Sequence, residues 1–123
     1  MEMTTLGKTG MEVSRLGAGL VEIGKQLTLN DVAQAGRVLN SALDAGINFL
    51  DTAECYGVSE ELIGLTIAHR RSEFILATKA GHVAGGYSGA PWTAQTVRDS
   101  IDRSLVRMKT DYVDLVQLHA YDV

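Results

Sequence analysis

The chain has 123 residues and a formal net charge of −4, which suits one domain with a hydrophobic core and argues against nucleic acid or an anionic membrane surface as a partner. No apolar run approaches the roughly 20 residues of a membrane span, and the N-terminus lacks the apolar region of a secretory signal. The single cysteine, Cys55, excludes a disulfide within the chain and predicts a cytoplasmic protein.

The predicted elements begin with a β-hairpin and then alternate between strands and helices. Residues 3–14 predict a small hairpin around the turn Lys8-Thr9-Gly10, because short turns that contain glycine commonly join two strands. The apolar patterns then predict strands near 16–21, 47–52, 74–79 and 112–119, and helices near 31–45, 59–69 and 94–108. A glycine-rich loop is expected over residues 81–92.

Capping residues mark the ends of the predicted helices. Asn30, Ser59 and Thr93 are candidate N-caps, because their side-chain oxygens can accept hydrogen bonds from the first helical turn. Gly46 stands where a left-handed glycine commonly ends a helix. The last helix is expected to carry one apolar stripe, formed by Val97, Ile101, Leu105 and Met108.

The alternation predicts an α/β fold with a parallel sheet and right-handed crossovers. Successive strands start roughly 25 to 40 residues apart, which suits the βα units of a (β/α)8 TIM barrel. Four strands are half of such a barrel, here preceded by the N-terminal hairpin. The periodicity also allows an open, doubly wound sheet.

Three predicted strands end on an ionisable residue. These residues are Asp51, Lys79 and His119. The carboxyl ends of parallel strands meet at one rim, where the active sites of barrels form. We therefore expect the three side chains to converge there. Tyr56 follows Asp51 by five residues, so it can fold back over the same rim.

Taken alone, each of these residues has a common structural explanation. An aspartate after an apolar strand is more often a turn or cap residue, and a lysine at a strand end is usually solvated. A lone histidine is more often structural than catalytic, and a tyrosine in a loop usually packs. We interpret the four as one group because an acid, a cation, an imidazole and a phenol fall at matching ends of consecutive strands.

These side-chain types suit proton transfer to a carbonyl oxygen. A phenol has an ordinary pKa near 10, and a nearby ammonium makes it a better acid. A carboxylate can hold that ammonium, and an imidazole can hydrogen-bond the carbonyl oxygen. Tyr56, assisted by the other three residues, is therefore predicted to protonate an alkoxide as it forms. The hydride must come from a cofactor, because no side chain supplies one.

Several stretches in the same order resemble the N-terminal part of the aldo-keto reductase family. They are LGKTGMEVSRLGAGL, AGINFLDTAECYGVSEELIG, FILATKAG and SLVRMKTDYVDLVQLH, which run from near residue 5 to His119. The resemblance implies a (β/α)8 barrel whose bottom is closed by the hairpin. It also implies reduction of aldehydes or ketones, or oxidation of alcohols or sugars, with NADPH, or with NADH as the alternative cofactor.

The resemblance also implies residue roles. The family's catalytic tetrad maps onto Asp51, Tyr56, Lys79 and His119, with Tyr56 as the general acid. By analogy the nicotinamide lies across the rim beside Asp51, lined by the backbone of Gly19, Leu20 and Val21. Trp92 is a candidate wall of the substrate pocket, although packing against the last helix is an equal alternative. No metal ligand is predicted, and Cys55, His69 and His82 are given no role.

The family's barrel is much longer than this chain, and its second half binds most of the dinucleotide. The resemblance therefore implies a fragment that carries the acid/base residues and is inactive alone. Two alternatives stay open: a non-catalytic half-barrel that self-associates through exposed strand edges, and an auxiliary binding subunit, like those family members that serve as auxiliary subunits of ion channels. The expected substrate is a small carbonyl compound or a sugar.

Overall fold

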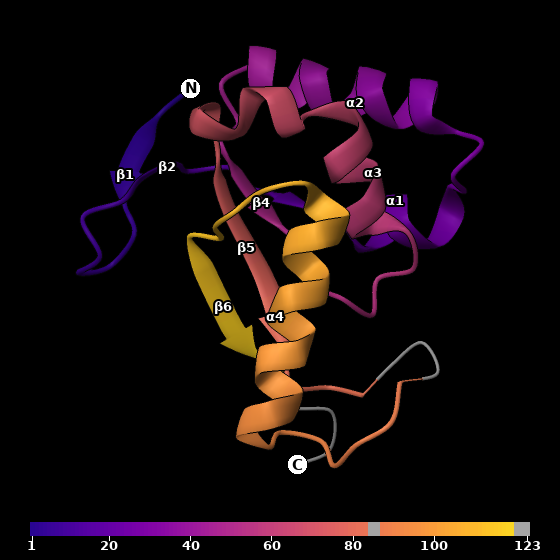
Figure 1. Ribbon diagram of the computed structural model, residues 1–123. Helices are drawn as coiled ribbons and strands as arrows, with labels where there is room; N and C mark the ends of the chain where they lie inside the picture. The colour runs from indigo at the N-terminus through magenta and orange to yellow at the C-terminus, as the bar shows by residue number, and fades with distance from the viewer. Residues whose placement is uncertain (84–86, 120–123) are drawn as a thin grey trace.

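The computed structural model describes residues 1–83 and 87–119. In chain order the strands and helices are β1 (Met3–Thr5), β2 (Glu12–Ser14), β3 (Ala18–Gly19), α1 (Val21–Gln26), α2 (Val32–Asp44), β4 (Phe49–Asp51), α3 (Ser59–Thr66), the 3-10 helix η1 (Ala68–Glu73), β5 (Ile75–Ala80), α4 (Ala94–Met108) and β6 (Leu115–Leu118). Strands β1 and β2 form an antiparallel hairpin, as predicted, which lies to one side of the rest of the chain (Figure 1).

The other four strands form one parallel sheet in the order β3-β4-β5-β6, which is also their order along the chain. Each strand therefore pairs with the strand before it, as in successive βα units. Figure 1 shows β5 and β6 running in the same direction, so that their carboxyl ends meet at one end of the molecule. The predicted parallel arrangement is confirmed.

The hydrophobic core lies between the sheet and the helices that cover one of its faces. Leu50 of β4 and Leu76 of β5 are fully buried at its centre. The buried residues of the core are Leu20, Leu39, Leu43, Leu50, Ile63, Ile67, Phe74, Leu76 and Met108. Since side chains alternate along a strand, the residues next to Leu50 and Leu76 point to the opposite face. Asp51 and Lys79 belong to that opposite face.

The first sheet strand is shorter than predicted. The sequence suggested a strand over 16–21, but β3 is only Ala18–Gly19, and Val21 begins the short helix α1. Gly24 inside α1 has low helix propensity, which is why the sequence did not predict this helix. None of the described helices is long and apolar enough to cross a membrane.

Two of the three predicted N-caps are wrong. The third N-cap and the glycine predicted at the end of a helix are confirmed. Asn30 does not cap α2, which follows Asp31. Ser59 is the first residue of α3 and not its cap, because its hydroxyl bonds that of Thr52 at 2.7 Å. Thr93 caps α4 by accepting from the backbone N–H of Thr96, and Gly46 has the predicted positive φ of 88°.

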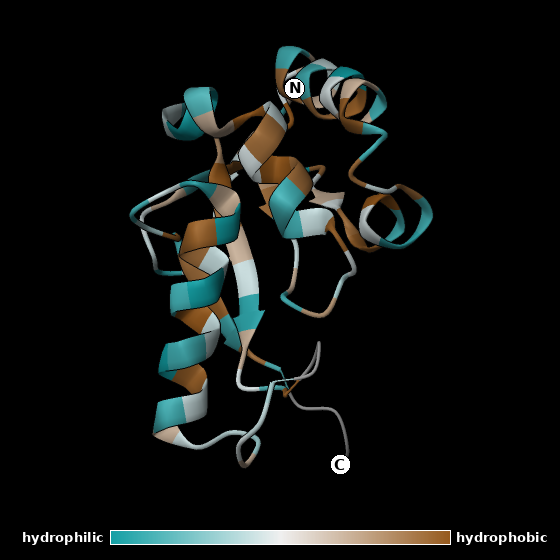
Figure 2. Ribbon diagram, turned by 45° about the vertical axis from the view of Figure 1, so that its right-hand side comes forward, coloured by the Kyte–Doolittle hydropathy of each residue, from teal (hydrophilic) through white to brown (hydrophobic). Residues whose placement is uncertain are grey.

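The buried stripe of α4 is offset by one residue from the predicted apolar stripe. Its buried members are Thr96, Ser100, Ser104 and Met108. Val97, Ile101 and Leu105 are only half-buried. Figure 2 shows hydrophilic and hydrophobic residues alternating along this helix. Within this stripe, the Ser100 hydroxyl donates to the buried carboxylate of Glu54, and the Thr96 hydroxyl donates to the Ala90 carbonyl at 2.6 Å.

Candidate active site

The parallel register brings the predicted site residues to one face and one end of the sheet. Asp51 of β4 pairs with Ala77 of β5, and Lys79 lies two residues further along β5, so both side chains share a face. His119 follows β6, and its backbone N–H donates to Ala80 O at 2.9 Å. Three separate strands therefore deliver these side chains to the same rim.

Lys79 and Asp51 form a tight ion pair. The Lys79 ammonium donates to both carboxylate oxygens of Asp51 at 2.9 Å and to the Thr52 carbonyl at 3.0 Å. The Lys79 side chain is 12% exposed and that of Asp51 is 36% exposed. Because all three donor positions of the ammonium are used, the position of the cation is fixed, while Asp51 stays open to the rim.

Tyr56 and His119 complete the group. The Lys79 ammonium lies 4.9 Å from the centre of the Tyr56 ring. The rings of Tyr56 and His119 are perpendicular, with their centres 6.2 Å apart. The Lys79 ammonium and the His119 ring therefore both lie beside the Tyr56 side chain. The structure thus brings all four predicted residues together.

A close contact between two glycines holds the loop that carries Tyr56. The backbone N–H of Val58 donates to Gly24 O at 3.1 Å. A Cβ on Gly24 would lie 1.7 Å from the Tyr56 carbonyl oxygen, and a Cβ on Gly57 would lie 2.0 Å from the Gly24 carbonyl oxygen. Gly57 also has a positive φ of 55°. Helix α1 can therefore touch the backbone of Tyr56 only because both residues are glycine.

The surroundings of His119 favour its neutral form. Burial lowers the pKa of His119 below its ordinary value of 6.5, and the neighbouring side chains of His82 and Lys79 lower it further, against the opposing effect of Asp51. A neutral imidazole can both donate and accept a hydrogen bond. Trp92 is 42% exposed, and its indole N–H donates to the His119 carbonyl at 2.6 Å. Trp92 therefore lies beside His119.

The three residues expected near a nicotinamide differ in their exposure and in the element they belong to. Gly19 is exposed at the end of β3, and a Cβ there would meet nothing within 4 Å. Leu20 is buried in the core, and its N–H donates to Asp51 O at 2.9 Å. Val21 lies in α1 and not in a strand. Gly19 therefore leaves open space at the end of β3, beside its register partner Asp51.

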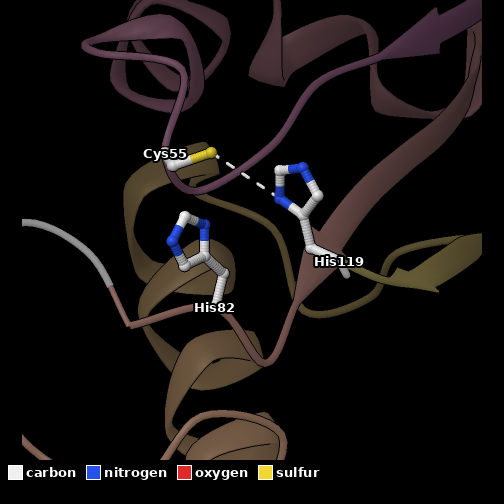
Figure 3. A group of neighbouring side chains, drawn as sticks. All are labelled: Cys55, His82 and His119. Atoms are coloured by element: carbon white, nitrogen blue, oxygen red, sulfur yellow. Dashed lines mark hydrogen bonds between the residues drawn. The ribbon is translucent and has the colours of Figure 1, made fainter. Parts of the chain in front are cut away.

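The sequence gave no role to Cys55 and His82, yet both lie beside His119. The Cys55 sulfur is 3.6 Å from His119 Nδ1 (Figure 3). The rings of His82 and His119 are perpendicular, with their centres 5.5 Å apart. No spacing in the sequence predicts this group, because Cys55 and His82 are placed by the paths of two loops and not by strand register.

Two buried carboxylates support the loop before Tyr56 and the start of α3. Glu54 accepts hydrogen bonds from Ser100 and from Arg103, the latter at 2.6 Å. Glu60 accepts from the Thr78 hydroxyl at 2.7 Å. Burial raises the pKa of Glu60. Because Glu54 immediately precedes Cys55 and Tyr56, its contacts with α4 fix the direction in which this loop leaves β4.

Comparison with known proteins identifies the family. The model of the aldo/keto reductase family matches residues 15–123. The uncharacterised oxidoreductase YqkF of Bacillus subtilis is 38% identical over 97% of this chain, and L-galactose dehydrogenase of Arabidopsis thaliana is 37% identical over 100%. The chain covers 39% of each relative. The holo form of the aldo-keto reductase AKR11C1 from Bacillus halodurans has a TM-score of 0.83 and 35% identity, over 97% of this chain and 40% of that one.

The chain therefore belongs to the aldo/keto reductase family, and the predicted resemblance is confirmed. The predicted fold class is confirmed as well, because the parallel sheet with its helices matches part of the barrel of a solved family member. The chain spans about two fifths of the length of the curated relatives it matches.

Proposed function

We propose that this chain carries the acid/base residues of an NAD(P)H-dependent oxidoreductase that reduces aldehydes or ketones, or oxidises alcohols or sugars. The observation that carries the proposal is the Lys79 ammonium, held at 2.9 Å by both oxygens of Asp51 and 4.9 Å from the Tyr56 ring. In this arrangement Asp51 holds the cation beside Tyr56, which is the proposed general acid. His119, neutral by its surroundings, orients the carbonyl oxygen.

Gly19 and Asp51 would hold the nicotinamide end of the cofactor, which supplies the hydride when it is bound. NADP is the proposed cofactor and NAD is the alternative. Trp92, at the rim, is the proposed wall of the substrate site. Small carbonyl compounds and sugars are the proposed substrates, in line with the similarity to a sugar dehydrogenase. Because the chain spans 39% of the relatives' length, we propose that it is inactive alone.

The test uses a complete barrel, built by joining residues 1–119 to the remaining C-terminal part of the Bacillus halodurans relative. Tyr56→Phe removes one hydroxyl, and we expect kcat for reduction of a small aldehyde to fall by about 10²- to 10⁴-fold, the usual contribution of a general acid. Tyr112→Phe is the matched control, because the Tyr112 ring stacks on Arg71 away from the site. Its activity should be unchanged.

A Tyr56→Phe barrel that keeps the kcat of the unchanged barrel would contradict the assignment of Tyr56. The two alternatives predict different results. A non-catalytic half-barrel predicts no NADPH-dependent turnover in the folded complete barrel. An auxiliary binding subunit predicts that substitutions of the tetrad leave its function unaffected.

A further inference from the structure

Three side chains of metal-ligand type meet beside the rim. Cys55 lies in the loop between β4 and α3, His82 follows β5, and His119 follows β6 (Figure 3). One ligand atom from each lies within 4.8 Å of the other two. All three side chains are half-buried, so an ion can reach them from solvent and still be partly shielded from water.

The donor atoms of this group, one sulfur and two imidazole nitrogens, favour Zn²⁺ as the metal. Zn²⁺ is bound by thiolate sulfur and imidazole nitrogen, and sites with three protein ligands leave a fourth position for water. Tetrahedral bonds of about 2.3 Å to sulfur and about 2.0–2.1 Å to nitrogen place these two atoms about 3.5 Å apart. The observed distance from the Cys55 sulfur to His119 Nδ1 is 3.6 Å. This pair is therefore already spaced as two ligands of one zinc ion.

The third ligand needs only a small movement. The largest separation in the group, up to 4.8 Å, exceeds the ligand spacing of a tetrahedral site by about 1 Å. Rotation of a histidine side chain covers that difference without moving the strands. Metal binding must release the thiol proton of Cys55, because the thiolate is the ligand.

We propose that Cys55, His82 and His119 bind one Zn²⁺ ion, with water in the fourth position. The ion binds Nδ1 of His119, the nitrogen that faces the Cys55 sulfur, and leaves Nε2 of the same ring for the role that the proposed function gives it. The metal site does not rest on the proposed function, because metal binding is measured without any turnover.

The test titrates the complete 123-residue chain with Co²⁺, a coloured substitute for Zn²⁺, and follows the visible absorption. Tetrahedral coordination with one thiolate is expected to give intense ligand-field bands and a sulfur-to-cobalt charge-transfer band, and an equimolar addition of Zn²⁺ should remove both. Cys55→Ser should abolish the charge-transfer band. His82→Gln should weaken Co²⁺ binding by at least about tenfold, because it removes one of three ligands.

His69→Gln is the matched control, because it makes the same substitution at an exposed histidine in η1, outside the group. Its spectrum and affinity should equal those of the unchanged chain. Circular dichroism of each variant shows whether the fold is kept. A folded chain without tetrahedral Co²⁺ bands would overturn the proposal. So would a charge-transfer band that survives Cys55→Ser, or an affinity that His82→Gln and His69→Gln change equally.

Discussion

Glu60 places a carboxylate in the packed interface between α3 and α4. It is 1% exposed, accepts from Thr78 at 2.7 Å and lies 3.4 Å from a nitrogen of Arg107. Burial raises the pKa of Glu60 even though Thr78 and Arg107 oppose the shift. The folded chain therefore binds this proton more tightly than the unfolded chain does.

This raised pKa predicts how stability depends on pH. Binding of a proton by Glu60 stabilises the folded chain, and this stabilisation is fully present below pH 4.5, the ordinary pKa of the carboxyl. It is lost as the pH rises through the raised pKa of Glu60 in the folded chain. Glu60→Gln keeps a neutral side chain at every pH. We expect its free energy of unfolding, relative to the unchanged chain, to rise with pH above 4.5, by at most about 1.4 kcal/mol per pH unit.

Urea denaturation at a series of pH values measures this difference. Glu61→Gln is the control, because Glu61 lies on the same helix and contacts the same Arg107, at 3.4 Å, but is 31% exposed. The control should show no comparable rise. Stability curves of Glu60→Gln and the unchanged chain that run parallel from pH 4 to pH 8 would rule out a raised pKa at Glu60.

Helix α1 meets the loop of Tyr56 through a contact that only glycine permits. Gly24→Ala would place a Cβ 1.7 Å from the Tyr56 carbonyl oxygen and 2.7 Å from the Ser59 Cβ. Since backbone cannot rotate away as a side chain can, we expect a loss of about 1–3 kcal/mol in the free energy of unfolding, as in other overpacked sites. The measurement is chemical denaturation followed by circular dichroism.

The same substitution in α2 should have the opposite effect. A Cβ on Gly36 would lie 3.5 Å from the Thr66 side chain, which is ordinary van der Waals contact. Because alanine favours a helix interior over glycine by about 0.5–1 kcal/mol, Gly36→Ala should stabilise the chain. Equal effects of Gly24→Ala and Gly36→Ala would show that α1 does not rest on the Tyr56 loop.

The elements differ in how well the sequence predicts them. Strands β4 and β5 begin in apolar runs, and parallel strands bring their carboxyl ends to one rim, so the approach of Asp51 and Lys79 could be predicted. The predicted Ser59 cap is wrong because a tertiary partner, Thr52, bonds its hydroxyl, and the local sequence does not show that partner. The neighbourhood of Cys55 and His82 depends on the course of two loops, for which the sequence carries no periodic signal.

At the scale of the whole molecule, the sheet formed by the described residues ends in two edge strands, each paired on one side only. β3 has two residues, and β6 is the longer edge. Leu118 of β6 is 64% exposed and Val116 is 37% exposed. An exposed parallel edge with apolar side chains can pair with another chain. We therefore expect the 123-residue chain to self-associate.

Analytical ultracentrifugation over a range of concentrations measures the association. Leu118→Lys places a charge on the β6 edge and should weaken self-association by at least about tenfold, the equivalent of one buried leucine contact. Val106→Lys is the control, because Val106 is 78% exposed on α4 and away from the edge. A compact monomer at every concentration would contradict this expectation.

The sheet order has a consequence for how the chain folds during its synthesis. Each strand pairs with the strand made just before it, so the sheet can grow vectorially as the chain leaves the ribosome, without waiting for a distant partner. The salt bridge between Lys79 and Asp51 can close once β5 has emerged, while His119 arrives a whole helix later. The ion pair between Lys79 and Asp51 can thus form early in synthesis, and His119 is the last of the four tetrad residues to reach the site.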